Sequence, residues 1–209
     1  MHDEHPACAF CDRAALSGVL LETERFLLLA DHAPLVEGHL LIIPRDHISC
    51  YGAAPAELDD ELCALKRRIA GFLASAYRAP FFFEHGVFGQ TVFHAHLHAL
   101  PLGAAALPLE DLLAAGGRPV SRPADVRAWH VERGHYYYIE RPGPNGLPAQ
   151  AAVFPPDPQT YFRALSMLRD AAGRLDGYEP VPVRRAGAAP KIAALAAYWR
   201  ALAATEDAS

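Results

Sequence analysis

The segment His94-Ala95-His96-Leu97-His98 constrains the fold more than any other part of the chain. Alternate side chains of a β-strand point to the same face, so histidines at every second position predict a strand with an imidazole face. Ala95, Leu97 and Ala99 then point into the core from the other face. Because each imidazole loses solvation when it is packed against protein, three on one face indicate chemistry rather than structural filling.

The histidine spacing alone is compatible with two kinds of chemistry. An H-x-H pair is a common spacing of metal ligands, and imidazole also acts as a nucleophile and as an acid or base. The preceding turn, Gly89-Gln90-Thr91-Val92, favours the second kind. A glycine-led turn offers backbone N–H groups and polar side chains to phosphate oxygens, and imidazole is a good nucleophile toward phosphorus near neutral pH.

The first half of the chain predicts an antiparallel meander with one long inserted helix. Short apolar runs between turn residues are typical of strands, and apolar residues at helical spacing after Pro55 predict the helix. The expected strands are 19–23, 26–30, 39–44, 81–83 and 92–100, and the expected helix is 55–77. Because the strands follow one another instead of alternating with helices, this order predicts an α+β fold.

The second half is richer in Ala, Gly and Pro and predicts an extension of mixed structure. The apolar strand runs on either side of a Pro-Gly-rich turn are typical of a hairpin. The expected elements are a short helix at 109–115, a hairpin of 136–140 and 150–154 around the turn 142–146, and helices at 158–174 and 190–204.

Composition narrows the class of protein. A chain of 209 residues with 52% hydrophobic residues can bury one sizeable core. A net charge of −5 argues against general binding to nucleic acid, which needs a basic face. No apolar run is long enough to span a membrane, and the polar start does not resemble a signal peptide, so we expect a cytoplasmic protein.

In a reducing compartment, the C-x-x-C formed by Cys8 and Cys11 is typical of a metal knuckle or a redox pair rather than a disulfide. Cys50 and Cys63 are isolated and are expected to be ordinary loop and helix cysteines.

Two segments together resemble the histidine triad (HIT) superfamily of nucleotide hydrolases and transferases. They are Asp31–Pro44 and Gly89–Pro101, which occur in the family's order and at its distance. The resemblance covers about residues 8–101. It implies a HIT-like antiparallel sheet over residues 1–104, with residues 105–209 as a C-terminal extension packed on the same domain. It also implies a small-molecule nucleotide as substrate, and homodimer formation is a further expectation.

The resemblance assigns a role to each histidine. His96 is the implied nucleophile, which attacks the α-phosphorus of the substrate and forms a covalent nucleotidyl-histidine. The backbone carbonyl of His94 fixes the tautomer of His96. His98 contacts the phosphate and helps to protonate the leaving group, and His39 supports the site from the neighbouring strand.

The resemblance also implies how the nucleotide is bound. Asp31 falls where the family binds the ribose hydroxyls, and Gln90 and Thr91 belong to the turn that holds phosphate oxygens. Glu84 is a departure, because it falls where many members have Asn or Gln touching the nucleotide. An acidic group there repels phosphate unless it is protonated or faces a hydroxyl or an amine, so Glu84 is either a binding residue with altered specificity or a surface residue at a strand end.

A structural zinc ion is a further implication, because zinc-containing relatives, including galactose-1-phosphate uridylyltransferases, use the matching positions. The implied ligands are Cys8, Cys11, His47 and His94, and they would pin the N-terminal segment under the histidine strand. A zinc-free pair of thiols is the alternative reading of the two cysteines.

Three functions therefore stay open at this point. The leading hypothesis is a nucleotide hydrolase or nucleotidyltransferase. A nucleotide-binding HIT module without turnover is less consistent with an intact triad and His39. A metalloenzyme with zinc at the triad is less consistent with a closed site that includes His94, because such a site keeps no open coordination position.

Overall fold

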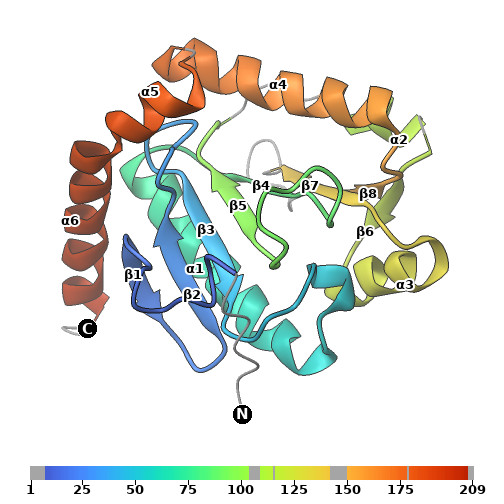
Figure 1. Cartoon of the computed structure of the whole chain (residues 1–209), viewed down its shortest axis with the longest axis horizontal. Coiled ribbons are helices and arrows are strands. Elements are labelled where there is room, and N and C mark those ends of the chain that lie inside the picture. The colour runs from blue at the N-terminus through green and yellow to red at the C-terminus, as the bar shows by residue number, and fades with distance from the viewer. Residues whose placement is uncertain (1–7, 104–108, 115, 142–149, 178, 207–209) are drawn as a thin grey trace.

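One antiparallel sheet of eight strands organises the chain, whose computed structural model describes residues 8–103, 109–114, 116–141, 150–177 and 179–206 (Figure 1). The strand order is β1-β2-β3-β5-β4-β7-β8-β6. The strands are β1 Val19–Glu22, β2 Phe26–Ala30, β3 Leu40–Pro44, β4 Phe81–Glu84, β5 Leu97–Leu100, β6 Arg118–Val120, β7 Tyr137–Arg141 and β8 Gln150–Phe154. The α-helices are α1 Asp59–Ala76, α2 Leu109–Ala114, α3 Pro123–Arg133, α4 Pro158–Asp176, α5 Val181–Ala186 and α6 Ala188–Glu206. The predicted α+β fold is confirmed.

The first half forms the meander that the sequence predicts. All residues of β2 and β3 are buried, and the two strands pair antiparallel from Phe26 with Pro44 to Ala30 with Leu40. After β3, short 3-10 turns at Tyr51–Ala53 and Ala56–Leu58 lead into α1. Helix α1 presents an apolar stripe that includes Leu65 to the sheet, and acidic residues in its first turn favour the positive end of the helix dipole.

The second half continues the same sheet. Strand β7 pairs antiparallel with β4 and then with β8, which confirms the two predicted strands of the hairpin, whose turn at 142–146 lies outside the described residues. Strand β4 is therefore an interior strand, flanked by β5 and β7. Strand β6 and helices α3 and α5 are additional to the sequence prediction.

The two faces of the sheet are covered by different segments. Helices α1, α3 and α6 contribute side chains such as Leu65, Trp129 and Trp199 to a core on one face. On the other face, α4 covers β4, β7 and β8 through side chains such as Tyr161 and Leu168. The N-terminal segment covers β2 and β3 on that same face, where Phe10 packs against a small cluster. In Figure 1, α1 lies behind the strands, and α4, α5 and α6 follow one another around the edge of the sheet.

The histidine segment differs from its prediction in one respect, because β5 begins only at Leu97. Its partner β3 ends at Pro44. The Pro44 carbonyl accepts a hydrogen bond of 2.8 Å from the side chain of His94, through Nε2. The Ala95 N–H donates to the Ile48 carbonyl at 2.6 Å, also outside the ladder. The alternation of faces nevertheless holds, since Ala95, Leu97 and Ala99 are all buried in the core.

Candidate active site and metal centre

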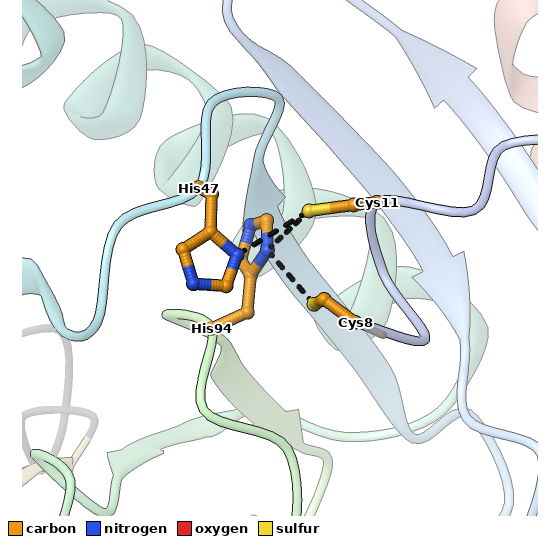
Figure 2. Close-up of side chains that lie close together, drawn as sticks. All are labelled: Cys8, Cys11, His47 and His94. Carbon is orange, nitrogen blue, oxygen red and sulfur yellow. Dashed lines mark hydrogen bonds between the residues drawn. The ribbon is translucent and has the colours of Figure 1, made fainter. Parts of the chain in front are cut away.

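Two cysteines and two histidines from three separate segments converge beside the sheet (Figure 2). Their ligand atoms all lie within 4.8 Å of one another. We call Cys8, Cys11, His47 and His94 the metal cluster. Cys8 and Cys11 come from the N-terminal loop, His47 follows β3, and His94 precedes β5.

The geometry of the metal cluster fits a tetrahedral ion. Zinc bound at about 2.3 Å from sulfur and about 2.1 Å from nitrogen spaces a sulfur and a nitrogen ligand about 3.6 Å apart. The Sγ of Cys11 lies 3.3 Å from His47 Nδ1 and 3.5 Å from His94 Nδ1, and Cys8 Sγ lies 3.6 Å from His94 Nδ1. The four predicted ligands are thus brought together in an arrangement that can hold a metal ion.

His94 connects the metal cluster to its neighbours through both its ring and its backbone. Its Nε2 is bonded to the Pro44 carbonyl, which leaves Nδ1 turned toward the cysteines. Such an outer hydrogen bond fixes the tautomer and orientation of a ligating imidazole. The backbone carbonyl of His94 accepts a hydrogen bond of 2.8 Å from His96 Nδ1. One residue therefore links the cysteine loop to the orientation of His96.

Four histidines lie together on the same face and form what we call the histidine cluster: His39, His85, His96 and His98. The rings of His96 and His98 are 5.0 Å apart, and His39 Nε2 lies 3.0 Å from His98 Nδ1. His39 Nδ1 accepts a hydrogen bond of 3.2 Å from the Leu35 N–H, and Asp31 Oδ2 lies 3.7 Å from the same nitrogen. The other nitrogen of His98, Nε2, is buried and has no hydrogen-bond partner among the described residues.

Burial keeps this cluster uncharged. It lowers the pKa of His96 and His39, although the nearby Asp31 carboxylate opposes the shift. It holds the pKa of His98 well below the ordinary value, and the neighbouring histidines add to that effect. Neutral imidazole is the form that carries a free lone pair, which nucleophilic attack requires.

The turn before the triad is anchored by the side chain of Gln90. The side-chain amide of Gln90 is buried and donates to the Ser49 carbonyl at 3.2 Å, whereas the Thr91 side chain is exposed. Gly86, Val87 and Gly89 all have positive φ. Such a conformation is costly for a β-branched residue like Val87 and persists only where the surroundings enforce it. The turn is therefore preorganised, with the Gln90 amide used internally.

Comparisons with known proteins identify the family of this chain. Residues 13–104 match the family model of the HIT domain. A stretch of 104 residues is 33% identical to an uncharacterized HIT-like protein of Mycobacterium tuberculosis, and it covers 45% of this chain and 70% of that protein. The chain belongs to the HIT family.

Solved structures give similar matches. A HIT family protein from Bacillus anthracis is 27% identical to this HIT chain, with 48% of this chain and 74% of that chain covered and a TM-score of 0.42. A structure described as a zinc-bound histidine triad family protein from Mycobacterium smegmatis is 22% identical, with 83% and 99% covered and a TM-score of 0.41. None of the described helices of this HIT protein is long and apolar enough to cross a membrane.

Glu84 does not join the histidine cluster. Along β4, Phe83 faces His98, while the Glu84 side chain points to the opposite face of the sheet. There its carboxylate accepts hydrogen bonds from the Tyr51 N–H at 2.8 Å and the Tyr136 hydroxyl at 2.7 Å. Burial raises the pKa of Glu84 to about 7. Glu84 lines a cavity of about 400 Å³ between α1, α3 and the sheet, which contains none of the triad histidines.

Sequence reasoning missed three residues of this HIT site. Phe10, inside the C-x-x-C, places its ring 5.7 Å from that of His94 and 5.5 Å from that of His96. His85 lies 5.5 Å from His98 between ring centres, and its Nδ1 is 2.8 Å from the Tyr161 hydroxyl on α4. The position of His85, directly after a strand and before a glycine-rich turn, was a usable signal. The sequence around Tyr161 contains no comparable signal, because only packing brings α4 to the site.

Proposed function

We propose that this HIT protein is a nucleotide hydrolase or nucleotidyltransferase that attacks the α-phosphate of its substrate with His96. The observation that carries the proposal is the hydrogen bond from His96 Nδ1 to the His94 carbonyl. A ring proton held on Nδ1 leaves the lone pair on Nε2, which makes no hydrogen bond with the residues that the structure describes. His96 is thus a neutral nucleophile of fixed tautomer in a site that excludes most water.

The reaction divides into two substitutions at phosphorus. In the first, His96 Nε2 forms a bond to the α-phosphorus while the bond to the leaving group breaks, and the leaving group departs with the electron pair. In the second, the oxygen of water or of another acceptor forms a bond to phosphorus and gives its proton to solvent, while the P–N bond breaks and its electron pair returns to Nε2, which restores neutral His96. The acceptor alone decides between hydrolysis and transfer.

The other predicted residues surround this step. His98 presents a buried Nε2 without a partner, which suits a phosphate oxygen of the bound nucleotide. His39 holds the opposite nitrogen of the same ring, and Asp31 lies behind His39. The Asp31 carboxylate accepts one hydrogen bond, from the Ala33 N–H at 2.6 Å. Its remaining lone pairs can accept hydrogen bonds from the ribose hydroxyls. Thr91 and the backbone of its turn are the proposed phosphate contacts.

The metal cluster is proposed to hold one zinc ion with a structural role. A mixed set of two thiolates and two imidazoles is typical of structural zinc. Zinc would join the N-terminal loop to the segments after β3 and before β5. Four protein ligands leave no open position for substrate, so the chemistry is assigned to the histidines.

We also propose that residues 105–209 form one structural unit with residues 1–104. The support is the pairing of β7 with β4 and the cover that α4 gives to the same sheet face.

Trapping of the intermediate tests the proposed function. The protein is incubated with nucleotides labelled at the α-phosphate: dinucleoside polyphosphates, nucleoside phosphoramidates and nucleotide sugars. We expect acid-labile label on His96, and a fall in turnover on the order of 10⁴ or more in His96→Gln. The exposed His135 provides the control, since His135→Gln should turn over normally. Nucleotide binding without label or turnover would support a non-catalytic nucleotide-binding protein instead.

A further inference from the structure

His85 is a fourth imidazole at the site, outside the triad motif. It follows β4 directly, and its ring centre lies 6.1 Å from that of His96 and 5.5 Å from that of His98. The edge of the Phe83 ring packs against it at 4.8 Å. His85 therefore lies about 1 Å further from His96 than His98 does, whose ring centre is 5.0 Å from that of His96.

Tyr161 on α4 determines how His85 is turned. Its hydroxyl lies 2.8 Å from His85 Nδ1, and this is its only hydrogen-bond partner among the described residues. When the hydroxyl donates its proton to Nδ1, the ring proton of His85 lies on Nε2. Tyr161 is itself fixed in place, because it is buried and contacts the rings of Phe88 at 4.9 Å and Tyr137 at 5.8 Å.

Helix α4 packs closely against the turn that contains Gly86 and Gly89. A Cβ added to Gly89 would lie 2.7 Å from the Tyr161 hydroxyl. Gly86, next to His85, is equally confined, since its Cβ would lie 2.2 Å from the Tyr136 carbonyl oxygen. Both glycines also have positive φ. The hydrogen-bonded pair of His85 and Tyr161 is thus held between the turn and the helix.

The electrostatics around the pair suit an anion. Burial lowers the pKa of His85 to about 3, the neighbouring His96 and Arg169 disfavour a further positive charge there, and a backbone hydrogen bond at Phe88 acts in the opposite direction. The ring is therefore a neutral N–H donor at ordinary pH. Burial raises the pKa of Tyr161, which keeps its proton available to His85. Arg169, two turns further along α4, is the cation that acts on both groups. A neutral donor beside a cation stabilises an oxyanion without giving up its proton.

We propose, on the basis of the proposed function, that His85 is a substrate-contacting residue, whose Nε2–H donates to an oxygen of the phosphate being transferred, and that Tyr161 is its positioning residue. The C-terminal extension is then part of the active site.

Two substitutions of the same residue separate this role from a structural one. The side-chain nitrogen of Gln can replace the Nε2–H of histidine, whereas Asn can replace only its Nδ1 side. We expect His85→Asn to lower kcat/KM about 100-fold, as removal of one oxyanion donor does, and His85→Gln to stay within about threefold of the parent. Tyr161→Phe should cost about fivefold, the effect of one ordinary hydrogen bond. Its effect should vanish in the His85→Asn background.

A purely structural pair gives a different pattern. If His85 only connects α4 to the turn, His85→Asn and His85→Gln should both lower the thermal midpoint and kcat/KM. In that case Gln should not restore the kcat/KM that Asn loses. Equal losses in the two variants, or no loss in either, would overturn the role of His85 while label on His96 in the parent protein leaves the proposed function intact.

A binding measurement keeps the test independent of turnover. Histidine side-chain ¹H–¹⁵N spectra of the full chain are recorded with inorganic phosphate and with adenosine 5′-monophosphate. We expect a protonated Nε2 on His85 whose resonance shifts on addition of either anion in the parent, and a smaller shift in Tyr161→Phe, which lacks the hydroxyl bonded to Nδ1. If no nucleotide labels His96 in the parent, the proposed function fails, and the His85 shift alone then decides the anion contact. A protonated Nδ1, or an unchanged His85 resonance, refutes it.

Discussion

The N-terminal loop and helix α4 approach the same histidines from two directions, but they are joined to them by different kinds of interaction. The loop reaches His94 through two thiols that form a metal cluster with it, and Phe10 packs against His96. Helix α4 reaches the site through the hydrogen bond between Tyr161 and His85. We expect the first connection to depend on a bound ion, whereas the second depends on packing between a turn and a helix.

This difference has a practical consequence. The metal side should respond to chelation and to loss of a thiolate, because metal binding would add to the apolar contacts that Phe10 and Leu16 make with the small cluster. The α4 side should respond to backbone strain, acid and fraying of the helix. A substitution on one of these two sides should leave the properties of the other side unchanged.

The largest effect is expected from the metal side. Replacement of Cys8 or Cys11 by Ser should reduce bound zinc from one ion per chain to none, because each supplies one of four ligands. Labelling of His96 should fall about 10- to 100-fold, the loss in activity typical when support of a metal site is removed, since the carbonyl of His94 orients His96, the proposed nucleophile. Elemental analysis and the trapping assay measure the two outcomes.

Cys63 supplies the matched control for this experiment. It lies on α1, outside the metal cluster, so Cys63→Ser should retain the zinc ion and the label. Zinc that persists after removal of both Cys8 and Cys11, with activity that follows it, would mean that the metal is bound at the triad instead.

On the α4 side, the strongest perturbation should be Gly86→Ala. The new Cβ would lie 2.2 Å from the Tyr136 backbone oxygen at a φ of +55°, so the turn that follows His85 must move. We expect a loss of more than about 2 kcal/mol in the free energy of unfolding. Gly71→Ala in α1 is the opposite control, because its Cβ meets nothing within 4 Å and should add about 0.5–1 kcal/mol. Urea unfolding measures both variants. Changes of the same sign in the free energy of unfolding would contradict this expectation.

The two sides also differ in how far the sequence reveals them. The resemblance to zinc-containing relatives implied the four metal ligands, and the structure brings Cys8, Cys11, His47 and His94 together. From the residues alone, only the C-x-x-C of Cys8 and Cys11 was typical of a metal site. The contact of His85 with Tyr161 depends instead on where α4 packs, and no local pattern encodes that.

The strand elements show the same limit. Alternation placed Ala95, Leu97 and Ala99 in the core correctly, because side-chain period alone determines it. The length of β5 was overestimated, because it depends on where the partner β3 ends at Pro44. Glu84 was expected near the nucleotide, but the alternation along β4 directs it to the other face, beside Tyr51 and Tyr136.

The free energy of unfolding should depend on pH in opposite ways through His85 on one face of the sheet and Glu84 on the other. The pKa of His85 in the folded state, about 3, is below that of an ordinary histidine, so the unfolded chain binds a proton that the fold rejects. Its contribution to stability is complete above about pH 6.5 and is lost as pH falls toward 3, with a slope of up to about 1.4 kcal/mol per pH unit. His85→Gln should therefore flatten the loss of stability between pH 6.5 and 4.

Glu84 provides a control of opposite sign within the same pH window. Its pKa is raised from 4.5 to about 7, so the fold binds the proton more tightly than the unfolded chain does. The stabilisation it gives is present below pH 4.5 and is lost as pH rises through 7. Glu84→Gln should make stability rise more steeply with pH, whereas His85→Gln makes it rise less. Unfolding curves in which both variants change the slope in the same direction would contradict these assignments.

The smallest effect is expected at the start of α4. Asp157 caps this helix by accepting the Thr160 N–H at 2.8 Å, one turn before Tyr161. Asp157→Ala should cost about 1 kcal/mol, as loss of an N-cap does, and Asp170→Ala on the exposed side of α4 should cost less. Because fraying of the first turn loosens Tyr161, Asp157→Ala should also weaken the orientation of His85 while zinc binding is unchanged. A loss of zinc in this variant would show that the two sides are coupled, and an unchanged His85 resonance would show that Tyr161 is held by its ring contacts with Phe88 and Tyr137 rather than by the cap.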